Sequence, residues 1–249
     1  MTLVRPVLVF CLLIGARGKA AAQAAGKPAF EVASIKPNTS GSRSSGTHAS
    51  EGLLRMTNES LKDCIEMAYD VRDFSLLAPD WLSTTRFDIV AKPPAAAKDR
   101  EFRQMMQTLL AERFGLEVHR EPKVLAAYAL VVAKGGAKLQ QGESGHGNSM
   151  NSNNDSNKSR LTAKGASMER LANYLARRLD RPVVDSTELK GVYDFTLEWT
   201  PEENKATSAD AGPSLFTAVQ EQLGLRLQSR KLSVDILVVD HVEKVPTEN

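Results

Sequence analysis

Apolar residues recur at the spacing of an amphipathic helix in four stretches of the chain. This spacing predicts helices over residues 60–70, 99–115, 167–180 and 213–224. Because a helix of about twelve residues is marginal alone in water, we expect each one to be stabilised by packing its apolar face on a sheet. In the first stretch that face consists of Leu61, Cys64, Ile65 and Ala68.

Alternation of apolar and polar residues, bounded by Gly, Pro and Asn, predicts strands between the helices. The shorter expected strands cover residues 30–38, 53–58, 74–79, 86–94, 159–166, 182–186 and 192–200. Two pairs of strands are also expected, 116–124 with 126–134 as a hairpin, and 225–231 with 233–242 at the end of the chain. The Ser/Gly-rich residues 39–52 and the polar residues 202–212 are expected as loops.

Residues 135–159 are rich in Gly, Ser and Asn and carry almost no apolar side chains. Such a segment buries too little apolar surface to offset the entropy that its ordering would cost. We therefore expect a disordered linker or a long loop that divides the chain into two parts.

The predicted elements follow the same order on both sides of this segment. Matching residues lie 105 to 109 positions apart: Thr57 and Thr162, Ser60 and Ser167, Asp88 and Asp194, Gly115 and Gly224, Val132 and Val239. This regularity predicts an α+β fold made of two tandem copies of a strand-helix-strand-strand-helix-strand-strand unit. The helices should pack on small mixed or antiparallel sheets. The first copy, with an N-terminal strand, is expected over residues 26–134 and the second over 160–249.

Residues 1–25 have the pattern of a secretory signal peptide. Arg5 precedes an apolar run of about ten residues, and small residues around Ala22 would suit a signal peptidase. The run is too short to span about 30 Å of hydrocarbon. We expect an exported protein, periplasmic or extracellular, with no stable membrane span after cleavage. Because Arg17 and Lys19 lie between the apolar run and the small residues, an uncleaved N-terminal anchor is the alternative.

The composition is that of a folded globular chain, with 42% hydrophobic and 25% charged residues. Cleavage removes Arg5, Arg17 and Lys19 from the 32 basic residues and none of the 30 acidic ones, which leaves a net charge of −1. This balance excludes the basic surface of a nucleic-acid-binding protein. Cleavage also removes Cys11, so Cys64 is left with no partner for an intramolecular disulfide.

The residues that could carry metal or thiol chemistry have no supporting pattern. The four histidines, His48, His119, His146 and His241, have no metal-ligand spacing and no cysteine beside them, which favours exposed histidines over a metal site. Cys64 lies on the inner face of its helix, which favours a buried thiol over a reactive one.

Motifs of known enzyme classes are also missing from the sequence. It contains no nucleophile elbow, P-loop or dinucleotide fingerprint. Asp88 and Asp194 each follow an aromatic residue at equivalent places, which favours a structural role such as capping a loop, with acid–base chemistry as the alternative. Trp81 and Trp199 are expected to fill the ends of the core, a binding surface being the alternative. We assign no catalytic, cofactor-binding or metal-binding residue and expect no cofactor.

Four segments of the chain begin "AYDVRDFSLLAPDW", "LLAERFGLEVHREP", "RPVVDSTELKGVYDF" and "SLFTAVQEQLGLRLQ". Together they resemble a large family of exported proteins of unknown function that is abundant in soil bacteria. The resemblance covers residues 30–249. Some relatives are attached to membrane metallopeptidase sensors of the antibiotic-sensor type, which implies a role in the cell envelope, although this chain has no H-E-x-x-H motif.

The apolar spacing of residues 167–191 and 214–228 is also similar to the short N-terminal domain of secretins and TonB-dependent transducers. That likeness implies small βαβ units that serve protein–protein contact in the periplasm. We therefore expect a non-catalytic protein-interaction or binding module of the envelope or the extracellular space, with another envelope protein or a peptide as its partner. The alternative is a secreted hydrolase with acidic residues at a cleft between the two repeats.

Overall fold

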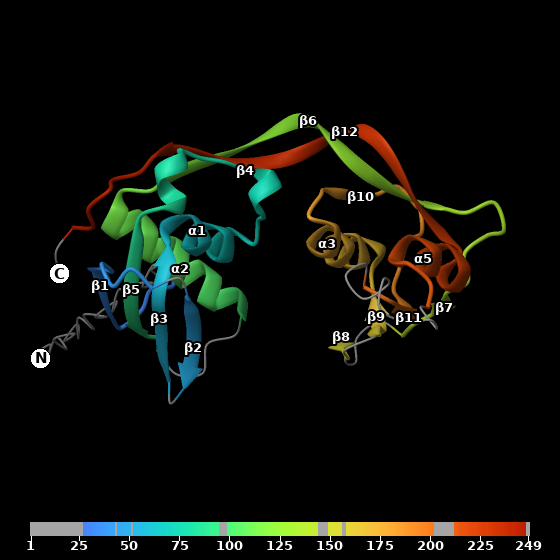
Figure 1. Ribbon diagram of the computed structural model, residues 1–249, viewed down its shortest axis with the longest axis horizontal. Helices are drawn as coiled ribbons and strands as arrows, with labels where there is room; N and C mark the ends of the chain where they lie inside the picture. Colours follow the sequence, from blue (N-terminus) through green and yellow to red (C-terminus); the bar gives the residue numbers. More distant parts are fainter. Residues whose placement is uncertain are drawn as a thin grey trace, which may run out of the picture.

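Two lobes joined by a long two-stranded ribbon make up the molecule (Figure 1). This computed structural model describes residues 27–42, 44–50, 52–94, 99–143, 149–155, 158–201 and 212–247. Within these residues the strands form three sheets of four strands each, and the helices pack on the sheets, so the predicted α+β class is confirmed. The predicted signal segment, residues 1–25, lies outside the described residues.

The first lobe has a sheet in the order β1-β5-β3-β2. Its strands are β1 (Val32–Pro37), β2 (Gly46–Ser50), β3 (Leu53–Ser60) and β5 (Arg86–Lys92), and its helices are α1 (Leu61–Tyr69) and α2 (Asp99–Phe114). Two 3₁₀ turns, η1 (Asp73–Ser75) and η2 (Asp80–Ser83), flank the short strand β4 (Leu76–Leu77). The apolar face predicted for α1 is fully buried: Leu61, Cys64, Ile65 and Ala68.

The second lobe repeats this plan with a sheet in the order β7-β11-β9-β8. Its strands are β7 (Gln140–Gln141), β8 (Ser149–Asn154), β9 (Ser159–Ala166) and β11 (Tyr193–Trp199), and its helices are α3 (Met168–Leu179) and α5 (Leu215–Leu223). Most of the polar loop predicted at residues 202–212 lies outside the described residues.

Two predicted loops contain strands instead. β2 lies within residues 39–52, and β7 and β8 lie within the predicted linker, residues 135–159. All three are edge strands of mostly polar residues, and they form because their backbones pair with β3, β11 and β9. Apolar alternation therefore could not reveal them.

The ribbon consists of two strands, β6 (Glu117–Val132) and β12 (Leu225–His241), which pair antiparallel over almost their whole length. The prediction of a hairpin over 116–134, and of two strands over 225–242, was wrong because each segment is one continuous strand. Pro122 lies within β6 opposite Asp235, at a point where β6 has a neighbour on one side only. Proline is tolerated in a strand with such a free side.

Each copy contributes the far half of its long strand to the lobe of the other copy. β10 (Val183–Asp185), from the second copy, pairs parallel with β6, while β4, from the first copy, pairs parallel with β12. Leu130 accordingly belongs to the core of the second lobe, and Leu237 belongs to the core of the first. The predicted copies, residues 26–134 and 160–249, are therefore not separate packing units, because their long strands cross from one lobe to the other.

Equivalent positions of the two copies share the same backbone geometry. Ser60 and Ser167 cap the starts of α1 and α3 by accepting hydrogen bonds from Asp63 N and Arg170 N. Left-handed φ angles also recur in pairs: Asn58 and Gly165 (54° and 60°), Asp70 and Asp180 (51° and 46°), Gly115 and Gly224 (57° and 64°). Positive φ is uncommon, so this agreement supports the predicted duplication.

Candidate functional site

Asp88 and Asp194 each accept a hydrogen bond from the backbone N–H of a residue with a left-handed φ angle on the neighbouring strand. Asp88 accepts hydrogen bonds from Asn38 Nδ2 at 2.7 Å and from Asn58 N at 2.9 Å, and these bonds lower the pKa of its carboxyl. Asp194 accepts a hydrogen bond from Gly165 N at 2.7 Å. Asn58 and Gly165 occupy equivalent places beside irregularities in strand pairing. Both carboxylates therefore have the structural role that their equivalence favoured.

The structure does not bring these two acids together. Asp88 lies on β5 and Asp194 on β11, in the sheets of different lobes. Each carboxylate is bound by groups of its own lobe, and neither lines any of the cavities described below. The geometry thus does not favour the alternative of shared acid–base chemistry.

Two of the histidines lie beside carboxylates. His119 Nδ1 lies 2.8 Å from the Asp240 carboxylate, which raises the pKa of the imidazole, and His241 Nε2 lies 3.0 Å from Glu243 Oε1. His48 lies on β2, and His146 lies outside the described residues. Among the described side chains, no group of three forms a metal-binding cluster.

Cys64 is fully buried within the first core, as its position on the helix predicted. Burial raises the pKa of its thiol far above the usual range, and the nearby charges of Glu59 and Asp63 add to this effect. A thiol in this state is protonated and inert at neutral pH.

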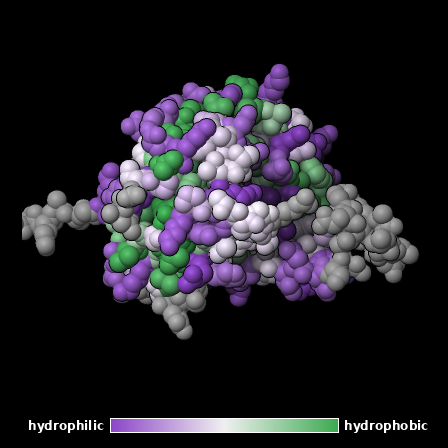
Figure 2. All heavy atoms as spheres, turned by 60° about the vertical axis from the view of Figure 1, so that its left-hand side comes forward, coloured by the Kyte–Doolittle hydropathy of each residue, from purple (hydrophilic) through white to green (hydrophobic). Residues whose placement is uncertain are grey.

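The two tryptophans pack on the cores as predicted. Trp199 is 5% exposed and contacts the ring of Tyr174 edge-on at a centroid distance of 6.4 Å. Trp81 is half-buried against the first core, with Lys244 Nζ 5.3 Å from its ring centroid. Figure 2 shows one face of the molecule, on which hydrophobic and hydrophilic residues are interspersed in small patches. The candidate site therefore lies in the hollows between elements.

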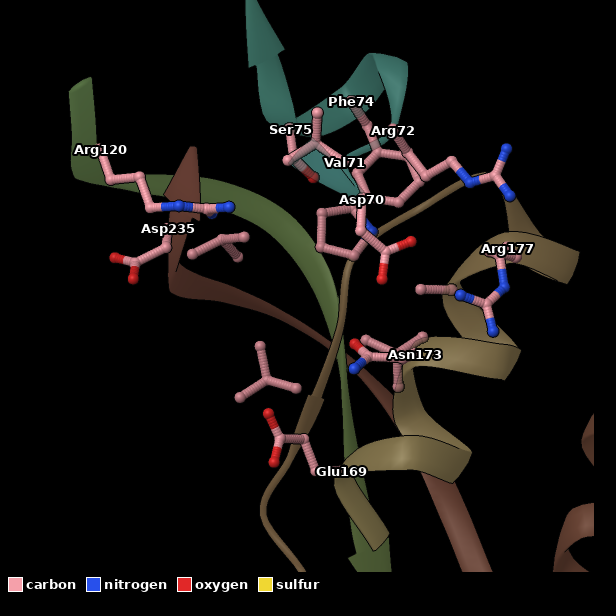
Figure 3. Close-up of a pocket in the computed structure, with 15 residues that line it drawn as sticks. Asp70, Val71, Arg72, Phe74, Ser75, Arg120, Glu169, Asn173, Arg177 and Asp235 are labelled. Atoms are coloured by element: carbon pink, nitrogen blue, oxygen red, sulfur yellow. The ribbon is translucent and has the colours of Figure 1, made fainter. Parts of the chain in front are cut away.

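A cavity of about 330 Å³, here called the inter-lobe cleft, lies where the two lobes and the ribbon meet (Figure 3). Its charged lining residues are Asp70, Arg72, Arg120, Glu169, Arg177 and Asp235. Arg72 from the first lobe and Arg177 from α3 lie on one side of the cleft, and Arg120 and Asp235 from the ribbon lie on the other.

The left-handed turn at the end of α1 positions the first-lobe side of the cleft. Asp70 caps α1 with a φ of 51°, and its carboxylate bonds Arg103 Nη1 at 2.7 Å. The chain then leads through Arg72 into η1, where Phe74 packs against the core of the second lobe. This contact fixes the place of Arg72 relative to α3.

A second cavity of about 420 Å³, here called the arginine hollow, adjoins the cleft and shares Arg72 and Arg177 with it. Its lining consists of Arg72, Met150, Ser152, Arg170, Tyr174, Arg177 and Arg178. Four of these seven residues are arginines and none is acidic. The hollow therefore concentrates positive charge on a surface formed by α3, β8 and the first lobe.

The arginines of the hollow differ in how they are held. Arg178 donates to Tyr174 Oη at 3.1 Å and to Asn154 Oδ1 at 3.2 Å, and its guanidinium lies over the rings of Tyr174 and Trp199. Arg72 and Arg177, by contrast, make no hydrogen bond or ion pair with the described residues. Their guanidinium groups are thus available to an anionic ligand.

The charge of Arg72 also acts on Glu66 of α1. Glu66 is half-buried, and this burial raises the pKa of its carboxyl, while the charges of Lys62 and Arg72 act in the opposite direction. Arg72 therefore interacts with Glu66 through longer-range attraction only, which leaves the donors of its guanidinium unoccupied.

Arg170, Asn173 and Arg177 lie on the outer face of α3, and all three are exposed. Nothing in the sequence alone assigned them a role. Arg72 lies about a hundred residues earlier in the chain, and Met150 and Ser152 lie in the predicted linker. The one signal in the sequence was the cluster of arginines on a single helix, which is also what an ordinary solvated helix face shows.

None of the described helices is long and apolar enough to cross a membrane. No curated protein and no solved structure matches the chain. A family model described as protein of unknown function DUF3738 matches residues 62–242. This match confirms the resemblance to a family of unknown function, whereas export, the association with soil bacteria and the likeness to secretins stay predictions. Because the match covers well over half of its length, the chain belongs to the DUF3738 family.

Proposed function

We propose that the protein is a non-catalytic binding module that holds another protein or a peptide at the arginine hollow. The observation that carries this proposal is the pair Arg72 and Arg177. They come from different lobes, line both cavities and have no ion-pair partner in the described structure.

The electrostatics of the hollow support an anionic ligand. Several guanidinium groups on one concave surface repel each other and raise the local positive potential, and an anion that enters relieves this repulsion. Arginine presents planar, paired N–H donors that fit a carboxylate with two parallel hydrogen bonds. Carboxylate-bearing side chains of a partner protein are the ligand groups that match this surface.

We further propose that binding takes place outside the cytoplasm, in the envelope or the extracellular space. The signal-peptide pattern of residues 1–25 supports this location. In that compartment the partner would be another exported protein, an envelope protein, or a peptide derived from one.

Site-specific photo-crosslinking in the native cells tests the proposal. A photoreactive residue is placed at Ser152 or at Asn173, which line the arginine hollow and the inter-lobe cleft, so that the arginines stay intact. The matched control places it at Thr57, an exposed position on β3 of the first lobe. We expect one discrete adduct from the two site positions and none from Thr57. Equal labelling from all three positions, or no adduct at all, would refute the proposal.

A further inference from the structure

β8 is an edge strand whose outer side has no partner among the described residues. All six residues from Ser149 to Asn154 pair with β9 on the inner side, and β8 ends the sheet order β7-β11-β9-β8. An edge strand of this kind exposes a row of unpaired backbone N–H and C=O groups.

The sequence of β8 lacks the usual protection of such an edge. Its six residues, Ser-Met-Asn-Ser-Asn-Asn, include no proline and no charge. The edge strand β1 of the other lobe ends in Lys36 and Pro37, and lysine and proline discourage the pairing of edges. The edge strand β2, Gly-Thr-His-Ala-Ser, is as little protected as β8, but it is β8 that borders the arginine hollow.

The outer edge of β8 and the arginine hollow form one continuous surface. Met150 and Ser152 line the hollow, so the side chains of Asn151 and Asn153 point to the opposite face of the sheet. Arg178 of α3 donates to Asn154 Oδ1 at 3.2 Å and thereby ties the end of β8 to the helix that carries Arg170 and Arg177.

We propose that an extended acidic segment of a partner protein adds to the outer edge of β8 as a fifth strand of this sheet. The proposal rests on the proposed function and specifies its ligand. Every second side chain of the added strand lies on the same face as Met150 and Ser152, and therefore beneath the arginines of α3. The segment accordingly carries Asp or Glu at alternate positions, with Arg177 and Arg72 as their unoccupied partners.

The combination of an edge and a cationic hollow selects a polypeptide. Backbone N–H and C=O groups in a row are complementary to another main chain, which supplies affinity, while the side-chain pockets supply specificity. A free phosphate or a sulfated sugar would satisfy the arginines but would leave the donors and acceptors of β8 unpaired. Strand addition satisfies both features together.

Binding of synthetic peptides to the full chain tests this inference by fluorescence anisotropy. The probe is a labelled peptide that alternates Glu and Thr over the length of β8. Its controls are a peptide of the same composition with all Glu residues in one block, and a peptide with Gln in place of Glu. The protein variants are Arg177→Glu and, as a control with the same change of charge, Arg55→Glu on the exposed side of β3.

We expect the alternating peptide to bind best, and Arg177→Glu to weaken it by at least about tenfold while Arg55→Glu has little effect. Hydrogen exchange then reports on the edge itself, because addition of a strand protects amides of β8 that were open. The inference would be overturned by equal binding of the block peptide or by unchanged hydrogen exchange in β8. It would also be overturned if heparin displaced the labelled peptide at a lower concentration than the unlabelled alternating peptide does. If no peptide binds while crosslinking from Ser152 still yields its adduct, this inference fails and the proposed function stands.

Discussion

Leu125 and Leu232 lie opposite each other at the middle of the ribbon, and they are the same position of the repeated unit. They are 107 residues apart, within the 105 to 109 positions that separate matching residues of the two copies elsewhere. A pseudo-twofold axis therefore passes between these two residues. The axis exchanges the lobes, and it explains why β4 pairs with β12 while β10 pairs with β6.

Gly115 and Gly224 are equivalent under this axis but should differ in their tolerance of a side chain. Both have left-handed φ angles, 57° and 64°. A Cβ at Gly115 would meet only side-chain atoms, the nearest at 3.8 Å, whereas a Cβ at Gly224 would collide with the backbone oxygen of Gly136. We expect Gly115→Ala to lower the free energy of unfolding by about 1 to 2 kcal/mol through its φ alone. Gly224→Ala should cost about 3 kcal/mol, since steric strain adds to that penalty.

Urea denaturation of the two alanine variants measures this difference. Equal losses of stability would show that Gly136 moves away without cost, which would contradict the close approach of these two backbone segments.

Asp88→Asn should destabilise the first lobe because the amide loses the charge that its two donors recognise. We expect a loss of about 1 to 2 kcal/mol at neutral pH. The folded state lowers the pKa of Asp88, so the stability that its carboxylate adds is present above the unfolded pKa of about 3.9 and is lost as the pH falls through the folded pKa. The difference between wild type and variant should therefore shrink in acid.

Chemical denaturation at several pH values checks this behaviour. Asp80→Asn is the matched control, because the Asp80 carboxylate is exposed and makes no hydrogen bond with the described residues. A difference that grew on acidification would contradict the assigned role of Asp88.

The pKa of His119 should lie above its ordinary value because Asp240 accepts its hydrogen bond and stabilises the charged imidazole. Asp240→Asn should return the pKa of His119 toward about 6.5. Because the folded state raises this pKa, the contribution to stability is present below about pH 6.5 and is lost as the pH rises through the folded pKa. NMR titration of the imidazole protons measures the shift. Asp235→Asn, on the same strand, should leave it unchanged, and an equal effect of both variants would count against the pairing with Asp240.

Cys64 should react with thiol reagents only when the first lobe opens. The experiment uses the Cys11→Ser chain, so that Cys64 is the only thiol. We expect slow labelling in buffer and fast labelling in denaturant, since the side chain is fully buried. Fast labelling under native conditions would show that the core is accessible. Cys64→Ala should cost about 1 kcal/mol for the lost apolar contact, and Cys64→Ser should cost more because a buried hydroxyl would lack a partner.

The helices could be predicted because their apolar periodicity reports burial directly. Leu171, Leu175 and Met168 repeat at helical spacing, and all three lie in the second core. The duplication was visible for a related reason, because capping residues such as Ser60 and Ser167 and turn residues such as Gly115 and Gly224 must recur where the geometry recurs.

The ribbon could not be predicted because its middle packs on neither lobe. Residues around Lys123 and Lys231 are exposed, and polar residues in the middle of a strand look the same as a turn in the sequence. Strand exchange leaves no local signal either, since Leu130 and Leu237 would be apolar in either lobe. The arginine hollow was missed for the same reason, because it joins segments whose meeting depends on that exchange.

The exchange of long strands has a consequence for how such a protein could have arisen. A shorter ancestral chain with a single copy would end in a strand whose far half had no core of its own to cover. Two such chains would complete one another as a symmetric homodimer, and fusion of the duplicated gene would turn that homodimer into one molecule. Expressed alone, either half of the present sequence should therefore self-associate instead of remaining monomeric.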